Sequence, residues 1–373
     1  MLFGRPCFTQ ENDIMSAKPV RVLVVGCGHM GTSHAKAYHA LPGFEIVGVV
    51  SRGEKSRRAL LDAVGADYPQ FANYDEALAA TTPDAVSINT YPDTHAPYAL
   101  AAFAAGCHVF LEKPLAVTVA EAEGVVAAAK AAGRKLVVGY ILRVHPTWKR
   151  FIETAQGLGR PLVMRMNLNQ QSSGEKWQTH KALMQSMSPI VDCGVHYVDV
   201  MCQMTRSKPV RVSAIGARLS AELEPEMYNY GCLQVAFADG SVGWYEAGWG
   251  PMMSETAFFV KDVIGPRGSV SIAGVEEGNA GSDDIEGHTK AAVLKVHHAE
   301  LTAAGGFARS DELLDCAGEP DHDGLCLLEQ EFFLDAIQHD RDLTDHGDDA
   351  VNSLRIVLAA DEAFRTGTTV TLV

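Results

Sequence analysis

A glycine-rich loop near the amino terminus constrains the fold more than any other feature of this sequence. Residues 20–25 (VRVLVV) form an unbroken apolar run rich in β-branched residues, which is typical of a strand buried on both faces of a parallel sheet. Gly26, Gly28 and Gly31 follow in the spacing G-x-G-x-x-G, and residues 32–41 then have helical character. In this context the glycines allow a tight turn, close approach of the backbone to a pyrophosphate, and close packing of helix on strand. The loop therefore predicts a dinucleotide site.

The segments that border this loop determine which dinucleotide fits. His29 and Met30 lie at the start of the helix, where backbone N–H groups and the helix dipole attract phosphate. An acid at the end of the second strand would bind the ribose 2′-hydroxyl of NAD, whereas an arginine accommodates the 2′-phosphate of NADP. Ser51 and Arg52 stand at that position, and Glu54 is the one acid close by. The sequence favours NADP; the alternative is that Arg52 stacks on the adenine and NAD is accepted as well.

Strand-like and helix-like segments alternate up to residue 140. Further strands are expected at residues 44–50, 84–89, 107–111 and 135–139, and Ala-rich helices at residues 94–105 and 119–132. Such alternation indicates βαβ units with right-handed crossovers, and hence a doubly wound parallel sheet in an α/β domain spanning residues 18–140. Residues 1–17 lack the apolar run of a signal peptide, and we expect a disordered leader there.

After residue 140 the sequence no longer alternates between strands and helices. Strands follow one another at residues 210–217, 232–237, 241–247, 257–264 and 269–272, and helices are expected at residues 146–156, 190–204, 325–339 and 348–365. Residues 274–287 have the composition of a surface loop, and a short strand closes the chain at residues 368–373. Consecutive strands predict an α+β domain over residues 141–373 with a large, mostly antiparallel open sheet. Its terminal helix can pack back on the first domain.

Composition narrows the possible partners and the compartment. The 373 residues carry a formal net charge of −15, which argues against duplex DNA or RNA as a partner. No apolar run approaches the roughly 20 residues that a membrane span needs. The eight cysteines form no C-x-x-C pair and read as thiols in a reducing cytoplasm. We therefore expect a cytoplasmic protein that acts on a small molecule.

Two further motifs carry candidate chemistry. Glu112-Lys113-Pro114 follows the fifth expected strand, at the carboxyl edge of the sheet where ligands bind in this architecture. Asp192 and His196 are spaced i,i+4 and would share one face of a helix, with a glycine between them. Histidine suits general acid–base work because its unperturbed pKa lies near the working pH.

At this point the chain resembles the Gfo/Idh/MocA oxidoreductase family, named for glucose-fructose oxidoreductase, inositol dehydrogenase and a rhizopine-catabolism protein. The matching motifs are the glycine loop, residues 90–95 (TYPDTH), residues 112–114 (EKP) and residues 192–196 (DCGVH). Their order and spacing agree from about residue 20 to residue 205. Tyr91 departs from the pattern, since members commonly have proline directly after the threonine.

The resemblance implies that Lys113, Asp192 and His196 carry catalysis. His196 would act as acid or base for a hydroxyl, Lys113 would bind the reacting oxygen, and Asp192 would orient the imidazole or bind a neighbouring hydroxyl. It also implies a cis peptide bond before Pro114 and a homodimer or homotetramer. Further cofactor contacts are expected at Thr90, Tyr91, His95 and Glu112.

Candidate substrate contacts are weaker. Arg143 begins the second domain where the family often has an arginine near the substrate, and an interdomain salt bridge is the equal alternative. Asn169, Trp177 and Tyr245 could line a sugar pocket, whereas Trp244 and Trp249 are expected to pack at the sheet or an interface. No metal site is predicted: residues 297–298 (HH) and 321–323 (DHD) lack the spacing of a closed site and read as solvated loop.

The leading hypothesis is a dehydrogenase or reductase, NADP-preferring, that acts on a sugar, polyol or inositol-like alcohol. One alternative is a family member that cleaves glycosides with transient use of bound NAD. The other is a non-catalytic dinucleotide or sugar sensor built on the same fold, which could dispense with Lys113 and His196.

Overall fold

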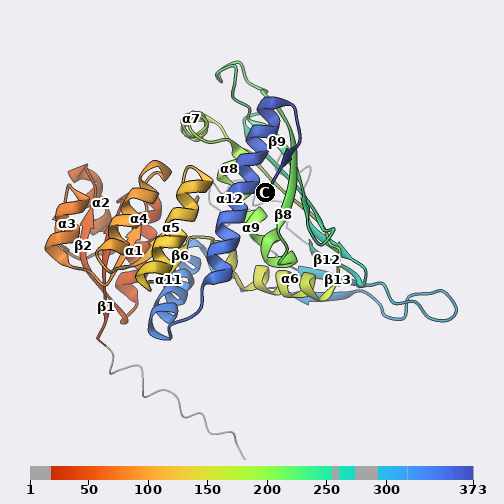
Figure 1. The fold of residues 1–373 in the computed structure, drawn as a ribbon, viewed down its shortest axis with the longest axis horizontal. Helices are drawn as coiled ribbons and strands as arrows, with labels where there is room; N and C mark the ends of the chain where they lie inside the picture. The colour runs from red at the N-terminus through yellow and green to blue at the C-terminus, as the bar shows by residue number, and fades with distance from the viewer. Residues whose placement is uncertain (1–17, 254–259, 274–292, 317, 373) are drawn as a thin grey trace, which may run out of the picture.

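The computed structural model describes residues 18–253, 260–273, 293–316 and 318–372. The expected leader and the expected 274–287 loop lie outside the described residues. Two domains stand side by side, the first drawn in red to yellow and the second in green to blue (Figure 1). The predicted fold class, an α/β domain followed by an α+β domain, is confirmed.

The first domain is built on a six-stranded parallel sheet in the order β3-β2-β1-β4-β5-β6. Its strands are β1 (Val20–Val25), β2 (Phe44–Val50), β3 (Gln70–Phe71), β4 (Ala85–Ile88), β5 (His108–Leu111) and β6 (Leu136–Val138). Its helices are α1 (His29–Ala40), α2 (Glu54–Val64), α3 (Tyr74–Thr81), α4 (His95–Ala104) and α5 (Val119–Ala132). The strand β3 and helices α2 and α3 were not predicted. The strand and α3 are short, whereas α2 is amphipathic and its pattern could have been recognised.

The second domain carries a nine-stranded sheet in the order β14-β13-β12-β11-β7-β10-β9-β8-β15. Its strands are β7 (Val163–Gln171), β8 (Pro209–Ala217), β9 (Tyr230–Phe237), β10 (Val242–Gly250), β11 (Lys261–Gly265), β12 (Gly268–Ala273), β13 (Val293–His298), β14 (Glu312–Asp315) and β15 (Val370–Thr371). Neighbours are antiparallel except β7 and β10, which run parallel. Sequence reasoning missed β7, whose sequence MRMNLNQQ mixes polar and apolar residues, and missed β13 and β14 as well.

Helices from the second half pack against both domains. They are α6 (Pro146–Gly157), α7 (Gly174–Leu183), α8 (Pro189–Asp192), α9 (Gly194–Thr205), α11 (His322–Gln338) and α12 (Thr344–Thr366). The segment expected as one helix at residues 190–204 is divided between α8 and α9. Helix α11 packs against α1 of the first domain, and α12 lies between α5 and β6 on one side and β8 and α9 on the other (Figure 1). Among the described residues, no helix combines the length and apolar character that a membrane span requires.

Candidate functional site

Lys113, Asp192 and His196 meet in a cavity of about 180 Å³ between the two domains. Lys113 follows β5 at the carboxyl edge of the parallel sheet, Asp192 ends α8, and His196 lies in the first turn of α9. The cavity is lined by Lys113, Leu142, Leu168, Gln170, His180, Asp192, Cys193, His196, Tyr197 and Trp249. Residues from the Rossmann sheet and from the second sheet therefore face one another across this space.

A close ion pair joins two of these residues. The Lys113 Nζ lies 2.8 Å from Asp192 Oδ1 and 3.2 Å from the Asp192 carbonyl oxygen. Burial opposes the charge of each group, yet the pair outweighs burial: the pKa of Lys113 is raised and that of Asp192 is lowered. Both groups are therefore charged at neutral pH. Asp192 was expected to orient the imidazole or to bind a neighbouring hydroxyl. In the structure its carboxylate pairs with Lys113 instead of the imidazole.

His196 is held neutral beside this pair. Its side chain is buried, and its Nδ1 has no hydrogen-bond partner among the described residues. Burial and the charge of Lys113 lower the pKa of His196 to about 3, although Asp192 acts in the opposite direction. Since Nδ1 is inaccessible, the ring faces the cavity through Nε2. The imidazole therefore has an open lone pair, but its pKa lies well below the near-neutral value expected from the sequence, which makes it a weaker base in this state of the protein.

Gly194, between Asp192 and His196, packs closely against the second sheet and α12. A Cβ on Gly194 would lie 3.1 Å from the Tyr245 ring and 3.3 Å from Val357 of α12. Both are tighter than ordinary contacts, so the Tyr245 and Val357 side chains would have to yield by a few tenths of an ångström to admit a side chain there. The glycine between Asp192 and His196 thus lets α9 sit directly on β10 and α12.

His95 organises the loops on the cofactor side. Its Nδ1 lies 2.7 Å from the Pro114 carbonyl oxygen, and its Nε2 lies 3.0 Å from the Thr90 carbonyl oxygen. Burial lowers the pKa of His95, and the two carbonyls oppose that shift. The Lys113–Pro114 peptide bond is cis, as the family resemblance implied. Tyr91, the departure from the family pattern, is 73% exposed.

The glycine loop fits a bound pyrophosphate. A Cβ on Gly26 would lie 2.4 Å from the Asn89 carbonyl oxygen, and one on Gly31 would lie 1.9 Å from the Gly26 carbonyl oxygen, so neither position admits a side chain. Gly28 faces open space, with nothing within 4 Å of its Cβ position. Helix α1 begins there without a side-chain cap, which leaves its first N–H groups available to an anion. His29 is exposed and Met30 half-buried at this helix start.

A second arginine joins Arg52 at the end of β2. Arg52 is exposed, and Ser51 Oγ lies 3.0 Å from Ser56 Oγ. Arg57, from the first turns of α2, folds back and donates from Nη1 to the Ser51 carbonyl oxygen. Its Nε is buried and has no partner among the described residues. Two guanidinium groups therefore flank the corner where the adenosine ribose of a dinucleotide lies in this fold.

Several residues expected at the substrate lie elsewhere. Arg143 takes the salt-bridge alternative: its guanidinium lies 2.5 Å from Asp199 and 3.1 Å from Asp349 and does not line the cavity. Asn169 lies on the outer face of the second sheet, where its Nδ2 donates to Glu246 at 2.8 Å. Trp177 of α7 donates to Glu222 at 3.2 Å. Tyr245 is buried and stacks on Tyr197 without lining the cavity. Glu112, expected as a cofactor contact, is also buried outside the cavity lining and lies 2.7 Å from His34.

Sequence reasoning missed the wall opposite the catalytic candidates. Trp249, expected to pack at the sheet, lines the cavity and donates from Nε1 to Gln170 Oε1 at 2.6 Å. The thiol of Cys193 lies 3.5 Å from the same oxygen. His180 stacks on Trp249 with ring centroids 4.5 Å apart. Gln170 and Trp249 are direct partners in the parallel β7–β10 pair, and only that pairing places them together.

Known proteins match both domains. Residues 20–140 match the model of an oxidoreductase family with an NAD-binding Rossmann fold, and residues 148–271 match the GFO/IDH/MocA C-terminal domain. A UDP-N-acetylglucosamine 3-dehydrogenase of Acidithiobacillus ferrooxidans is 32% identical over 197 residues, which is 53% of this chain and 58% of the relative. An inositol 2-dehydrogenase of Klebsiella pneumoniae is 31% identical over 183 residues, 48% of this chain and 52% of the relative. The chain thus spans little more than half the length of these curated relatives.

Solved structures match almost the whole chain. GenD2 from gentamicin A biosynthesis, in complex with NAD, is 26% identical with a TM-score of 0.73, covering 96% of this chain and 97% of that one. A scyllo-inositol dehydrogenase from Lactobacillus casei, with bound NAD(H) and scyllo-inositol, has a TM-score of 0.74 at 19% identity, covering 95% and 99%. At 19% identity, the likeness to the scyllo-inositol dehydrogenase shows a shared fold only.

Proposed function

The chain belongs to the Gfo/Idh/MocA oxidoreductase family, and on this premise we propose that it is an NAD(P)-dependent dehydrogenase acting on a sugar, polyol or inositol-like ring. Hydride would pass between the nicotinamide and a secondary alcohol or ketone. The observation that carries the proposal is the meeting of the Lys113–Asp192 ion pair and neutral His196 in one cavity at the carboxyl edge of the Rossmann sheet.

Each of the three residues has a task that its geometry supports. Bound nicotinamide supplies the hydride acceptor or donor. His196, neutral and open at Nε2, takes the proton of the substrate hydroxyl during oxidation. The Lys113 ammonium has three N–H groups, of which Asp192 occupies two, and the third can bind the reacting oxygen and stabilise its developing charge. Asp192 raises the pKa of Lys113, which keeps the ammonium charged, and its hydrogen bond fixes the position of Nζ.

The wall opposite these residues supports a neutral, hydroxyl-rich substrate. Because Trp249 donates to Gln170 Oε1, the amide is fixed with its Nε2 turned away from the indole. That nitrogen has no hydrogen-bond partner within the described parts of the chain, and Gln170 lines the cavity, so it offers N–H donors to a substrate oxygen. Of the lining residues that the structure describes, the one lysine is paired with the one aspartate. We therefore propose a ring without a charged group at this subsite.

We propose NADP as the preferred cofactor, with NAD as the alternative. Arg52 and Arg57 flank the end of β2, and guanidinium groups bind phosphate through charge-assisted hydrogen bonds. Glu54, the nearest acid, is exposed at the start of α2 and lies past the turn. The solved relative GenD2 was obtained with NAD, so both nucleotides belong in the test.

Assembly as a homodimer or homotetramer is also proposed. Val163, Val242 and Ile264 are exposed neighbours on the outer face of the second sheet, and Ile215 on β8 is 70% exposed. Contiguous exposed apolar side chains mark interaction surfaces more often than they remain in water. Light scattering on the purified chain should give a dimer or larger, and a monomer at micromolar concentration would contradict this assignment.

A substrate screen tests the function. Purified protein is offered glucose, myo-inositol, scyllo-inositol and UDP-N-acetylglucosamine with NAD and with NADP, and reduced nicotinamide is followed by its near-ultraviolet absorbance. We expect turnover with at least one neutral polyol ring. Tightly retained cofactor with glycoside cleavage and no net reduction would favour the glycoside-cleaving alternative. Dinucleotide binding without turnover in either direction would favour the sensor.

A further inference from the structure

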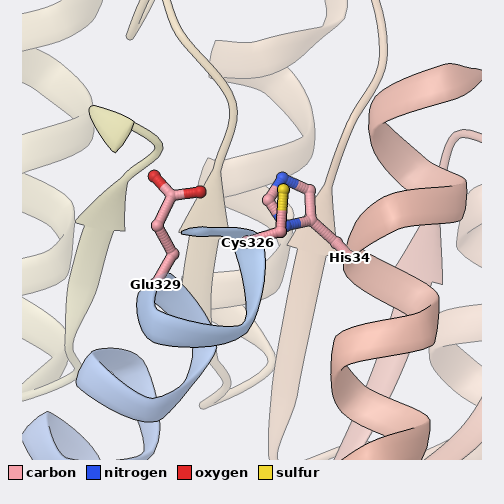
Figure 2. Close-up of side chains that lie close together, drawn as sticks. All are labelled: His34, Cys326 and Glu329. Atoms are coloured by element: carbon pink, nitrogen blue, oxygen red, sulfur yellow. The ribbon is translucent and has the colours of Figure 1, made fainter. Parts of the chain in front are cut away.

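A second cluster of reactive side chains lies outside the cavity, where α11 packs against α1. His34 reaches from α1 toward Cys326 and Glu329 of α11, and all three side chains are buried (Figure 2). One ring nitrogen of His34, the Cys326 sulfur and a Glu329 carboxyl oxygen lie within 4.8 Å of one another. We propose that these residues form a structural metal site suited to zinc, which clamps the carboxyl-terminal helix onto the Rossmann domain.

The hydrogen bonds of His34 leave the correct nitrogen for a metal. Its Nε2 lies 2.7 Å from Glu112 Oε1. Donation from Nε2 to the Glu112 carboxylate leaves the lone pair of the ring on Nδ1. Metal-binding histidines are typically oriented in this way, with the other ring N–H donated to a carboxylate.

Gln330 supplies a second, independent observation. Its Nε2 lies 3.0 Å from His34 Nδ1, whereas its Oε1 is buried and has no hydrogen-bond partner among the described residues. Leaving a buried acceptor unpaired costs about 1–3 kcal/mol. A metal ion at Nδ1 would take the place of the amide N–H, and turning the amide over would direct the orphaned oxygen to the ion. Cys326, Glu329 and Gln330 are spaced i, i+3, i+4, so they share one face of α11.

The charges balance when a divalent ion binds. Glu329 and Cys326 would bind a metal as a carboxylate and a thiolate, so binding releases any proton that either group carries. The resulting carboxylate and thiolate neutralise the two positive charges of the ion. The buried site then carries no added net charge, which avoids the cost of an isolated buried charge.

The donor set indicates the metal. Thiolate, imidazole and carboxylate ligands in four-coordinate sites are typical of zinc, with Gln330 Oε1 or a water as the fourth ligand. The outer carboxylate, Glu112, also accepts a hydrogen bond from the Lys113 backbone N–H at 3.1 Å. The site would thus connect α11 to the backbone of the catalytic lysine. The histidines that look metal-like in sequence do not lie in solvated loops as expected. His297 and His298 lie in β13 and pair with Asp311 at 2.8 Å and Glu312 at 2.9 Å, whereas His322 is buried at the start of α11 with its Nε2 3.8 Å from Cys326 Sγ.

The test is metal binding, measured without reference to activity. The full-length protein is loaded with zinc, desalted and analysed for metal content, and is separately loaded with cobalt for absorption spectroscopy. We expect one zinc per chain and a near-ultraviolet thiolate-to-cobalt charge-transfer band. Cys326→Ser should lose both, whereas Cys202→Ser, which alters a buried thiol of α9 outside this cluster, should keep both.

A second variant protects the test against misfolding. Glu329→Gln keeps the size and shape of the side chain, so the variant should fold like the wild type, but it cannot supply an anionic ligand. We expect its zinc to be lost on desalting. Zinc should also raise the melting temperature of the wild type and not that of Glu329→Gln. Absence of metal uptake by the wild type, or a cobalt spectrum unchanged by Cys326→Ser, would overturn the proposal.

Discussion

The substitution Gln170→Met tests most directly the proposal that Gln170, on the side of the cavity opposite His196, binds the substrate. Gln170 has two roles in the proposed site: its Nε2 offers a donor to the substrate, and its Oε1 accepts from Trp249 Nε1 at 2.6 Å. Methionine has a similar length and neither function. The variant therefore loses one hydrogen bond to the substrate and leaves a buried indole N–H unpaired.

The two losses have different magnitudes and different readouts. A neutral hydrogen bond contributes about 0.5–1.5 kcal/mol, so KM should rise roughly two- to tenfold. Because this bond forms in the ground state as well as the transition state, kcat should change little. The unpaired indole should lower the free energy of unfolding by about 1–3 kcal/mol. Steady-state kinetics and urea unfolding measure the two effects separately.

Matched variants separate these effects from general damage. Asn169→Ser alters the adjacent residue on the outer face of the same strand and should leave KM unchanged. Adding Trp249→Phe to Gln170→Met removes the orphaned N–H, so the double variant should be more stable than the sum of the single losses indicates. A normal KM in Gln170→Met together with a raised KM in Asn169→Ser would refute the assignment of the wall.

Four further predictions concern His196, the arginines at the end of β2, and Arg143. His196 should show no NMR titration between pH 5 and pH 8, because burial and Lys113 lower its pKa to about 3, and Lys113→Met should raise that pKa; a wild-type midpoint near the usual 6.5 contradicts this. Since unfolded histidine binds its proton below about pH 6.5 and folded His196 does not, this residue should make unfolding easier as pH falls from 6.5 toward 3. Arg57→Ala and Arg52→Ala should each weaken NADP more than NAD in fluorescence titrations, and equal losses would count against recognition of the 2′-phosphate. Arg143→Met should lower stability by about 3–5 kcal/mol in urea unfolding, because it strands two carboxylate partners, with KM unchanged; a raised KM at normal stability would restore the substrate role.

The first domain could be predicted because its signals are local. The buried run at residues 20–25, the glycine spacing after it and the repeated strand–helix alternation each depend on a few neighbouring residues. Lys113, Asp192 and His196 were identified because each lies in a short motif with a fixed place at a strand end or helix start. Their meeting in one cavity follows from the architecture, which brings strand ends of the first domain to the face of the second.

The substrate wall could not be predicted because it depends on the pairing of distant strands. A shift of one residue along β7 exchanges its two faces, so the sequence could not separate outward-facing Asn169 from inward-facing Gln170. Trp249 reads as a core residue until β10 is paired in parallel with β7. His34 and Cys326 lie near opposite ends of the chain, so no spacing rule could connect them.

The account rests on the claim that Lys113, Asp192 and His196 form a hydride-transfer site. The most direct measurement is single-turnover reduction of bound cofactor by the best ring of the substrate screen, in the wild type, Lys113→Ala and His196→Ala. We predict that both variants bind the dinucleotide with nearly wild-type affinity but reduce it at least ~100-fold more slowly. Near-wild-type rates in both variants would contradict the account.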